Sequence, residues 1–167
     1  MTTRDDHRQA QIRPVGPEPG IAEMLTGALM YSSSTEAAAV LALVHDDDVD
    51  PPLTVVLAKI RSLVDRGVVP APQLVLDELK RTGELTRQVA KTLATATTTG
   101  ACASAARHYA AATVAESLRR RVESAGAALT SAANTAPEAD LAPLVEQAAA
   151  TIAGCAWRLD SLRGDRP

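Results

Sequence analysis

The feature that most constrains the fold is the regular spacing of apolar residues in the last third of the chain. Over residues 104–133 and again over 137–163, Leu, Val and Ile recur at steps of three and four positions. This spacing places them along one side of an α-helix. Only residues 134–137 interrupt the pattern, and helices joined by so short a connection pack antiparallel. The sequence therefore predicts a C-terminal antiparallel helical hairpin over 104–163.

The apolar seam of this hairpin is narrow and is flanked by alanines, so it resembles a coiled-coil stripe. This seam can be buried in two ways, between the two helices of one chain or across a two-fold axis between two copies. The spacing favours neither. In the second case the chain is a homodimer. The candidate dimer-interface residues are Leu118, Val122, Leu129, Leu141, Leu144, Val145, Ile152 and Leu159.

The composition points to the same fold class. The chain contains no Phe, two Tyr and one Trp, while Ala makes up about a fifth of its 167 residues. Ala has the highest helix propensity, and its small side chain lets helices approach closely. With so few aromatic anchors, the core has to come from Leu, Val and Ile, which favours thin helix–helix packing. We therefore predict an all-α fold.

Residues 1–19 are polar and rich in proline, and we predict a disordered N-terminal arm. Residues 20–163 then form one helical domain, with a small N-terminal bundle over 20–99 and the hairpin over 104–163. The helices expected in the bundle span 21–29, 37–45, 51–66, 74–82 and 86–95. The β-branched run Thr95–Gly100 has poor helix propensity and is predicted to be a loop.

Several of these helices carry recognisable end signals. Ser33 and Glu36 have the capping-box spacing at the start of the second helix. Asp50–Pro51 has the composition of an N-cap followed by a first-turn proline at the start of the third helix. Gly67 suits the left-handed position that ends that helix. Thr86 is expected to cap the fifth helix.

The densest run of carboxylates is Asp46–Asp50. Hard cations prefer clustered oxygen ligands, but the Gly and the distal Glu of a calcium-binding loop are missing at their required spacing. We interpret this run as a solvated acidic loop that also favours the N-terminus of the following helix. No metal site is predicted.

The strongest basic cluster is Arg119, Arg120 and Arg121. Consecutive residues on a helix point about 100° apart, so these side chains cannot all face one phosphate groove. No aromatic residues interleave with them to stack on bases. We expect them to lie in solvent and to pair with Glu116 or Glu123; contact with nucleic acid is the alternative.

The remaining polar residues show no catalytic arrangement. The sequence contains neither G-x-x-x-x-G-K-[S/T] nor G-x-G-x-x-G, so we predict no phosphate-binding loop, no cofactor and no enzyme. His108 has no carboxylate at helical spacing that would make it a general base. Cys102 and Cys155 are expected to be small buried hydrophobic residues. Trp157 fits a core position and an interface position equally well.

The cysteine spacing, the first 19 residues and the length of the apolar runs predict where the protein is located. Two distant cysteines do not form a disulfide framework, and the first 19 residues lack the apolar segment of a signal peptide. No apolar run is long enough to cross a bilayer. We expect a cytoplasmic protein that does not contact a membrane.

Residues 53–85 resemble the N-terminal domain of DnaB-type replicative helicases. In that family one helix ends in a charged residue plus Gly, a connector with an apolar residue before Pro follows, and the next helix ends in Leu-x-x-x-Gly-x-Leu. The corresponding residues here are Asp65-Arg66-Gly67, Val69-Pro70 and Leu79-Lys80-Arg81-Thr82-Gly83-Glu84-Leu85. Their order and spacing together carry the resemblance.

The resemblance continues on both sides of this segment. Residues 20–30 are similar to the opening helix of the family, residues 101–110 to its Ala-Ala-Asn-x-x-x-Tyr-Ala segment, and residues 115–122 to the helix that follows. It covers about residues 20–133, and 137–163 look like the helix that leads toward the linker of the helicase.

The sequence departs from the family pattern at three places. Asp47-Asp48-Val49 stands where the family has an acidic residue followed by Phe-Tyr, and Thr86-Arg87-Gln88 replaces a Gly-Gly turn. The Asn of the Ala-Ala-Asn segment is missing. These departures bear on the contacts that the family makes through those positions.

The resemblance implies a domain that dimerises through its terminal hairpin and meets primase and a helicase loader. Since the sequence has no Walker loop, we expect a non-catalytic interaction and dimerisation module that acts in or on DNA replication. The expected partners are a second copy and a replicative helicase, primase or loader. The alternative is a DNA-binding regulator that uses Arg119–Arg121, and the net charge of −3 argues against it.

Overall fold

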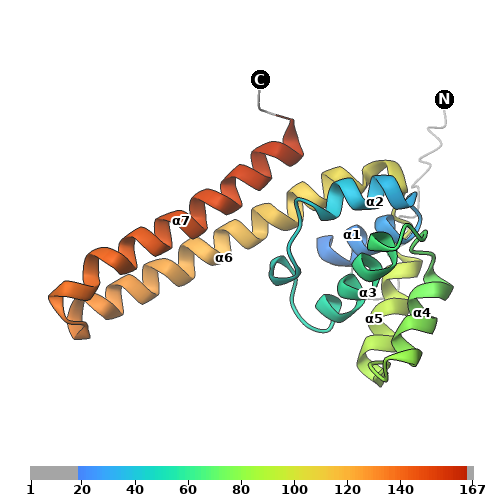
Figure 1. Cartoon of the computed structure of the whole chain (residues 1–167), viewed down its shortest axis with the longest axis horizontal. Helices are drawn as coiled ribbons and strands as arrows, with labels where there is room; N and C mark the ends of the chain where they lie inside the picture. Colours follow the sequence, from blue (N-terminus) through green and yellow to red (C-terminus); the bar gives the residue numbers. More distant parts are fainter. Residues whose placement is uncertain (1–18, 165–167) are drawn as a thin grey trace, which may run out of the picture.

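The computed structural model describes residues 19–164, which fold into seven α-helices and two short 3₁₀ helices (Figure 1). In chain order the elements are α1 (Ile21–Met30), α2 (Ser34–Leu41), η1 (Asp46–Asp48), α3 (Leu53–Asp65), α4 (Pro72–Arg81), α5 (Arg87–Thr98), η2 (Ala103–Ala105), α6 (Ala106–Thr135) and α7 (Glu138–Arg163). No strand occurs in this range. The predicted all-α fold class is confirmed. The disordered arm predicted for residues 1–19 lies, except for its last residue, outside the described residues.

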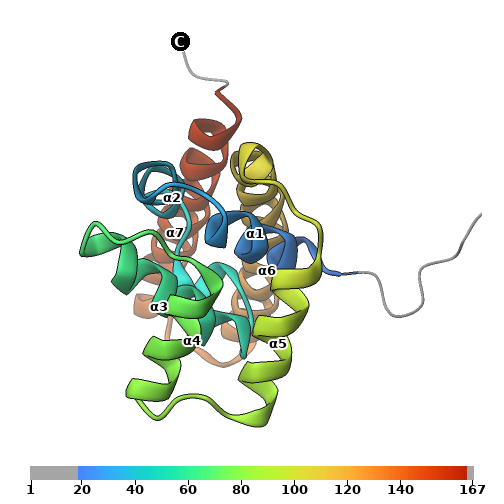
Figure 2. The same cartoon turned by 90° about the vertical axis from the view of Figure 1, so that its right-hand side faces the viewer.

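Helices α1 to α5 and the first half of α6 form a small bundle, and α1 lies at its centre (Figures 1 and 2). α1 packs against α3, α5 and α6. Every residue of α1 from Leu25 to Met30 is buried, because a helix that is apolar or small on all sides has to lie inside a core. The largest fully buried apolar side chains of the core are Leu25, Leu29, Met30, Leu57, Ile60 and Leu79.

α1 and α5 approach each other closely at Gly27. A Cβ atom there would lie 2.4 Å from the carbonyl oxygen of Ala96 and 2.7 Å from Oγ1 of Thr99. Real Cβ atoms do not come so near a backbone oxygen, so the approach requires glycine. Ala96 is fully buried by this contact, and the last turn of α5 is therefore part of the core.

The loop predicted for Thr95–Gly100 is wrong, because α5 continues to Thr98. Burial of Ala96 outweighs the weak helix propensity of the neighbouring threonines. The hydroxyls of Thr97 and Thr98 also donate to helix carbonyls three and four residues earlier, which satisfies them within the helix. A Gly100 φ of +70° marks the turn that follows.

Two other helix ends differ from the prediction. α2 ends at Leu41 instead of continuing to His45. α3 begins at Leu53, and its N-cap is Pro52 rather than Asp50. A residue that precedes proline is kept out of the helical region. Pro51 therefore cannot begin a helix in front of Pro52, and the start of α3 moves two residues along the chain.

The remaining end signals are confirmed. Ser33 Oγ accepts a hydrogen bond from the backbone N–H of Glu36, and the Glu36 carboxylate accepts from the backbone N–H of Ser33. Thr86 Oγ1 accepts from the backbone N–H of Val89 at the start of α5. Gly67 has a φ of +72° and ends α3 in the left-handed conformation.

The predicted hairpin is formed by α6 and α7. The first half of α6 is part of the bundle, and its second half extends away from the bundle beside α7 (Figure 1). α7 runs back antiparallel along α6, and its last turn returns to the start of α6. There Arg107 donates from Nε to the carbonyl oxygen of Leu162 at 2.8 Å and from Nη2 to that of Ser161. A cation at the C-terminus of a helix complements its dipole, so Arg107 holds the two helix ends together.

Candidate interaction surface on the helical hairpin

The outer part of the hairpin, residues 122–154, contains no buried residue. We call these residues the distal hairpin. Large apolar side chains are nevertheless present there: Val122 is 49% exposed, Leu144 is 38% exposed and Val145 is 52% exposed. Most of the stability of a helix in a protein comes from packing of its apolar face. The distal hairpin is therefore a two-helix projection whose apolar face is only partly used by its own chain.

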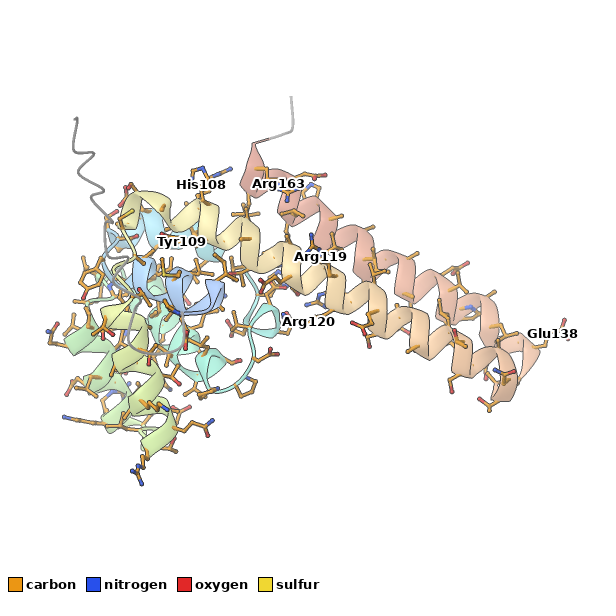
Figure 3. All side chains as sticks on the ribbon, turned by 180° about the vertical axis from the view of Figure 1, so that it is seen from behind. His108, Tyr109, Arg119, Arg120, Glu138 and Arg163 are labelled. Atoms are coloured by element: carbon orange, nitrogen blue, oxygen red, sulfur yellow. The ribbon has the colours of Figure 1, made fainter. Side chains whose placement is uncertain are left out.

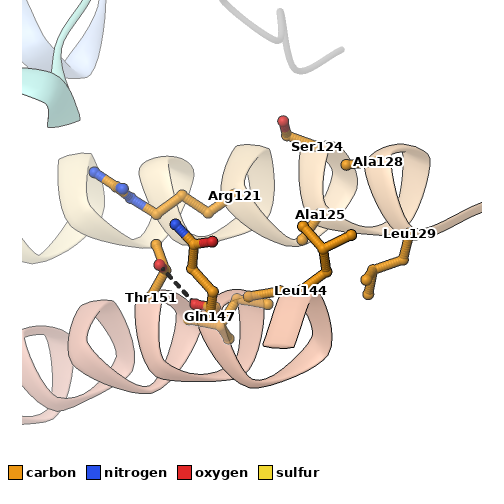
Figure 4. A pocket seen from close by; sticks show the side chains of 10 residues that line it. Arg121, Ser124, Ala125, Ala128, Leu129, Leu144, Gln147 and Thr151 are labelled. Atoms are coloured by element: carbon orange, nitrogen blue, oxygen red, sulfur yellow. Dashed lines mark hydrogen bonds between the residues drawn. The ribbon is translucent and has the colours of Figure 1, made fainter. Parts of the chain in front are cut away.

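A groove runs between α6 and α7 along the distal hairpin (Figure 4). Its volume is about 340 Å³. We call it the hairpin groove, and its lining residues are Arg121, Ser124, Ala125, Ala128, Leu129, Leu144, Gln147, Ala148, Thr151 and Ile152. The alanines leave the space that a bulkier side chain from outside would fill. The hydroxyl of Thr151 is satisfied by donating to the carbonyl oxygen of Gln147 at 2.9 Å.

The groove lining is mostly apolar or small and carries little charge. Arg121 is its one ionisable lining residue, and this guanidinium is engaged by Asp47 at 2.8 Å. No His, Cys, Asp, Glu or Lys lines the groove, so the hydroxyls of Ser124 and Thr151 have no base beside them there. Elsewhere in residues 19–164, no group of three His, Cys, Asp or Glu side chains is placed to hold a metal ion.

The distal hairpin is acidic. It carries Glu123, Glu138, Asp140 and Glu146, and it has no Lys, Arg or His. All four carboxylates are exposed. Glu138, labelled at the tip in Figure 3, and Asp140 lie in the first turn of α7, where the helix dipole favours negative charge.

The base of the hairpin is anchored to the bundle by Asp48 of η1. The Asp48 side chain is fully buried, and the Arg158 side chain of α7 is only 7% exposed. Arg158 forms a bidentate ion pair with Asp48, with Nη2 lying 3.0 Å from Oδ1. Ser117 of α6 donates to Oδ1 at 2.7 Å, and the backbone N–H of His45 donates to Oδ2 at 2.8 Å. One carboxylate therefore connects α6, α7 and the segment between α2 and α3.

Two more arginines of α6 reinforce this anchor. Arg120 donates to the carbonyl oxygen of Asp48 at 2.7 Å. Arg121 lies 3.4 Å from Oδ1 of Asp48, in addition to its ion pair with Asp47. We call Asp48, Ser117, Arg120, Arg121 and Arg158 the Asp48 cluster.

The environment keeps the cluster ionised. Burial raises the pKa of the Asp48 carboxyl, but the hydrogen bonds from Arg158, Ser117 and the His45 backbone outweigh it, and the pKa lies below its ordinary value of 3.8. Burial lowers the pKa of Arg158, but its hydrogen bond and charge interaction with Asp48 hold that pKa above the ordinary value. The pair is therefore a buried ion pair at neutral pH.

The structure corrects two predictions here. The acidic run Asp46–Asp50 is not a solvated loop, because Asp48 is buried. Arg120 and Arg121 do not pair with Glu116 or Glu123, because they bind the acidic run instead. Arg119 is exposed, as expected (Figure 3). The sequence contains a run of Asp (Asp46–Asp48) and a run of Arg (Arg119–Arg121) whose charges are complementary. No local pattern in the sequence shows that the two runs are in contact.

The candidate interface residues fall into three groups. Val122, Leu144 and Val145 are exposed. Leu159 is buried within its own chain and lies outside the distal hairpin. The other four are partly buried: Leu118, Leu129, Leu141 and Ile152. The groove thus brings Leu129, Leu144 and Ile152 together, and the dimer interface itself stays a prediction.

The sequence also singled out Trp157, the two cysteines and His108, which do not line the hairpin groove. Trp157 is 46% exposed, so a core position is wrong for it. Cys155 is buried as expected, whereas Cys102 is exposed, contrary to the prediction. His108 is exposed near the start of α6 (Figure 3). No helix in residues 19–164 has the length and apolar character that a membrane span requires.

Comparison with known proteins finds a likeness among solved structures. The sequence matches no model of a protein family and no curated protein. Among solved structures, it is similar to the crystal structure of the N-terminal domain of DnaB helicase from Mycobacterium tuberculosis. The two are 30% identical with a TM-score of 0.65, and the match covers 82% of this chain and 98% of that one. The likeness thus extends over nearly the whole of that domain.

Proposed function

Because this chain belongs to the family of DnaB helicase N-terminal domains, we propose that it is a non-catalytic interaction module of DNA replication. Its hairpin is the association surface, and a second copy of the chain is one occupant of that surface. A replicative helicase, a primase or a helicase loader in the cytoplasm is the further partner. The groove supports a binding role, since its lining combines apolar side chains with no catalytic pair.

The observation that carries this proposal is the absence of any buried residue in the distal hairpin. The helices there are long, yet Val122, Leu144 and Val145 stay exposed. Contact with a partner would remove this apolar surface from water and stabilise the helices at the same time. Without a partner, the exposed parts of these apolar side chains add no stability to the hairpin.

The dimer part of the proposal is tested by sedimentation equilibrium. The variant is Leu144→Ser in the groove, and the matched control is Leu74→Ser on α4, since Leu74 is 42% exposed and Leu144 is 38% exposed. Burying a Leu side chain is worth about 1.5–3 kcal/mol, so Leu144→Ser should weaken the dimer roughly tenfold or more. The control should leave it unchanged. A wild-type chain that stays monomeric at high concentration would refute the dimer.

The replication part needs a separate measurement. The tagged full chain is mixed with purified DnaB-type helicase, primase and loader, each in turn, and binding is followed by interferometry. Binding to at least one, lost in Leu144→Ser and kept in Leu74→Ser, is the expected result. If the chain binds none of the three proteins, the replication role is refuted, and the dimerisation role is unaffected.

The DNA-binding alternative has less support from the structure. Arg120 and Arg121 are occupied by Asp48 and Asp47. Of these three arginines only Arg119 is left to meet a phosphate, and one cation of the cluster gives weak, non-specific attraction.

A further inference from the structure

A pocket lies beside Trp157, between α7 and the residues that follow α2. Its volume is about 390 Å³. We call it the Trp157 pocket, and its lining includes Ala42, His45, Arg121, Ala150, Gly154 and Trp157. Trp157 is 46% exposed and is the one tryptophan of the chain. A large aromatic side chain and a pocket therefore lie next to each other on the same face of the hairpin.

We propose that the Trp157 pocket receives the Trp157 side chain of a second copy, so that two copies exchange tryptophans across a two-fold axis. In such an interface both copies use the same surface and every contact occurs twice. An identical copy fits this surface best, because it supplies both the ring and the pocket. The inference rests on the proposed function, since it takes a second copy to bind the hairpin, and it names the residue that anchors the contact.

Gly154 provides the space opposite the tryptophan ring. It is exposed, and a Cβ atom at this position would have nothing within 4 Å. Glycine inside a helix is less favourable than alanine, so the fold of a single chain gives no reason for glycine here. The close approach of an aromatic ring from a second copy does give a reason.

The positions of Gly154 and Trp157 on α7 permit a symmetric exchange. Residues three positions apart lie on the same side of a helix, and about 4.5 Å separates them along its axis. When two α7 helices run antiparallel about an axis between residues 155 and 156, each Trp157 faces Gly154 of the other copy. Residue 163 of one copy is then opposite residue 148 of the other, so the last turns of α7 lie beside the hairpin groove.

The Trp157 pocket adjoins the hairpin groove, because Arg121 and Thr151 line both. One continuous surface therefore offers the apolar side chains of the groove and a pocket for an aromatic ring. Arg158 also lines the pocket, and it binds Asp48 through both of its terminal nitrogens. A guanidinium held in this way can stack its plane on an aromatic ring. The lining thus suits an indole better than an aliphatic side chain.

The experiment uses the tryptophan as the reporter of its own burial. Because the chain has one tryptophan, its emission comes from residue 157 alone. Emission and quenching by acrylamide are recorded over a dilution series of the full chain, and sedimentation equilibrium gives the dimer Kd in the same buffer. As the dimer forms, the emission maximum should move to shorter wavelength and quenching should fall, because the ring leaves water.

Variants of the two residues locate the contact. Trp157→Ala should weaken the dimer by the cost of an interface hot spot, which is roughly 30-fold or more in Kd. Trp157→Phe should weaken it less. Gly154→Leu fills the space opposite the ring, so it should weaken the dimer and remove the emission shift.

The matched control is Gly126→Leu on α6. Gly126 is also an exposed glycine with nothing within 4 Å of an added Cβ, but it lines neither the pocket nor the groove. This variant should leave the dimer Kd and the emission shift unchanged. Circular dichroism confirms that each variant is as helical as the wild type.

Three results would overturn the inference: a dimer that forms without an emission shift, a dimer that Trp157→Ala leaves unchanged, or a shift that appears only when helicase, primase or loader is added. The third result would assign the pocket to that protein. A dimer that is weakened by Leu144→Ser but not by Trp157→Ala contradicts this inference alone. A chain that stays monomeric at every concentration refutes the dimer of the proposed function together with this inference.

Discussion

Replacing Asp48 by Asn tests whether the buried ion pair anchors the hairpin. Asn is close to Asp in size, so the substitution removes the charge and leaves the cavity nearly filled. Arg158 then remains buried without a counter-ion, with a side chain that is only 7% exposed. Ser117, whose hydroxyl donates to Oδ1, loses a charged acceptor at the same time.

The expected cost follows from the burial of both partners. Removing one member of a buried ion pair typically costs about 3–5 kcal/mol, because the other charge is left uncompensated. Neither side chain is exposed enough for solvent to screen the effect. A loss of this size is a large part of the roughly 5–15 kcal/mol that stabilises a typical domain. Urea unfolding of Asp48→Asn at pH 7, followed by circular dichroism, measures it.

The control and the pH dependence make the test specific. Asp46 also pairs with an arginine, but its side chain is 42% exposed, so Asp46→Asn should cost less than about 1 kcal/mol. Because the pKa of Asp48 is lowered in the folded protein, its contribution is present above pH 3.8 and is lost as the pH falls through the folded pKa. The difference between the wild type and Asp48→Asn should therefore shrink in acid. If Asp48→Asn costs no more than Asp46→Asn at pH 7, the anchoring role is wrong.

Three further outcomes are expected. Gly27→Ala should destabilise the protein by about 1–3 kcal/mol in urea unfolding, because the added methyl group collides with the carbonyl oxygen of Ala96. Gly126→Ala, in open space on α6, should stabilise it by up to about 1 kcal/mol; equal effects at the two glycines would contradict the close α1–α5 contact. Titration with labelled single- and double-stranded DNA at low salt should give no binding that depends on Arg119–Arg121, and strong binding abolished by their replacement with Ala would restore the DNA-binding alternative.

The parts of the fold that sequence could predict depend on neighbouring residues. Ser33 and Thr86 cap their helices through hydrogen bonds to residues three positions away. Gly67 ends α3 because glycine adopts a positive φ without strain. The hairpin was predictable for the same reason, since a repeat of three and four residues is visible within each helix.

The parts that sequence could not predict depend on contacts between distant residues. The helical conformation near Thr95–Thr98 follows from the burial of Ala96 against Gly27, and no local propensity encodes it. Asp48 and Arg158 are separated by 110 positions, and each reads locally as an ordinary surface charge. The partner of an ionic residue is chosen by the packing of the helices that carry it, so the site appears only when the bundle and hairpin are in place.

The Asp48 cluster and the hairpin groove are connected through helices α6 and α7. α6 passes without a break from the bundle core into the distal hairpin, and Arg158 secures α7 only one turn beyond the end of that segment. The two walls of the groove are therefore held in register before any partner arrives, which lowers the ordering cost of binding. Asp48→Asn changes no residue that lines the groove, yet it removes the buried ion pair that helps to hold α7 against the bundle. It should therefore weaken association at the groove while Asp46→Asn leaves association unchanged, and equal affinities for these two variants would show that the groove is held by the seam between α6 and α7 alone.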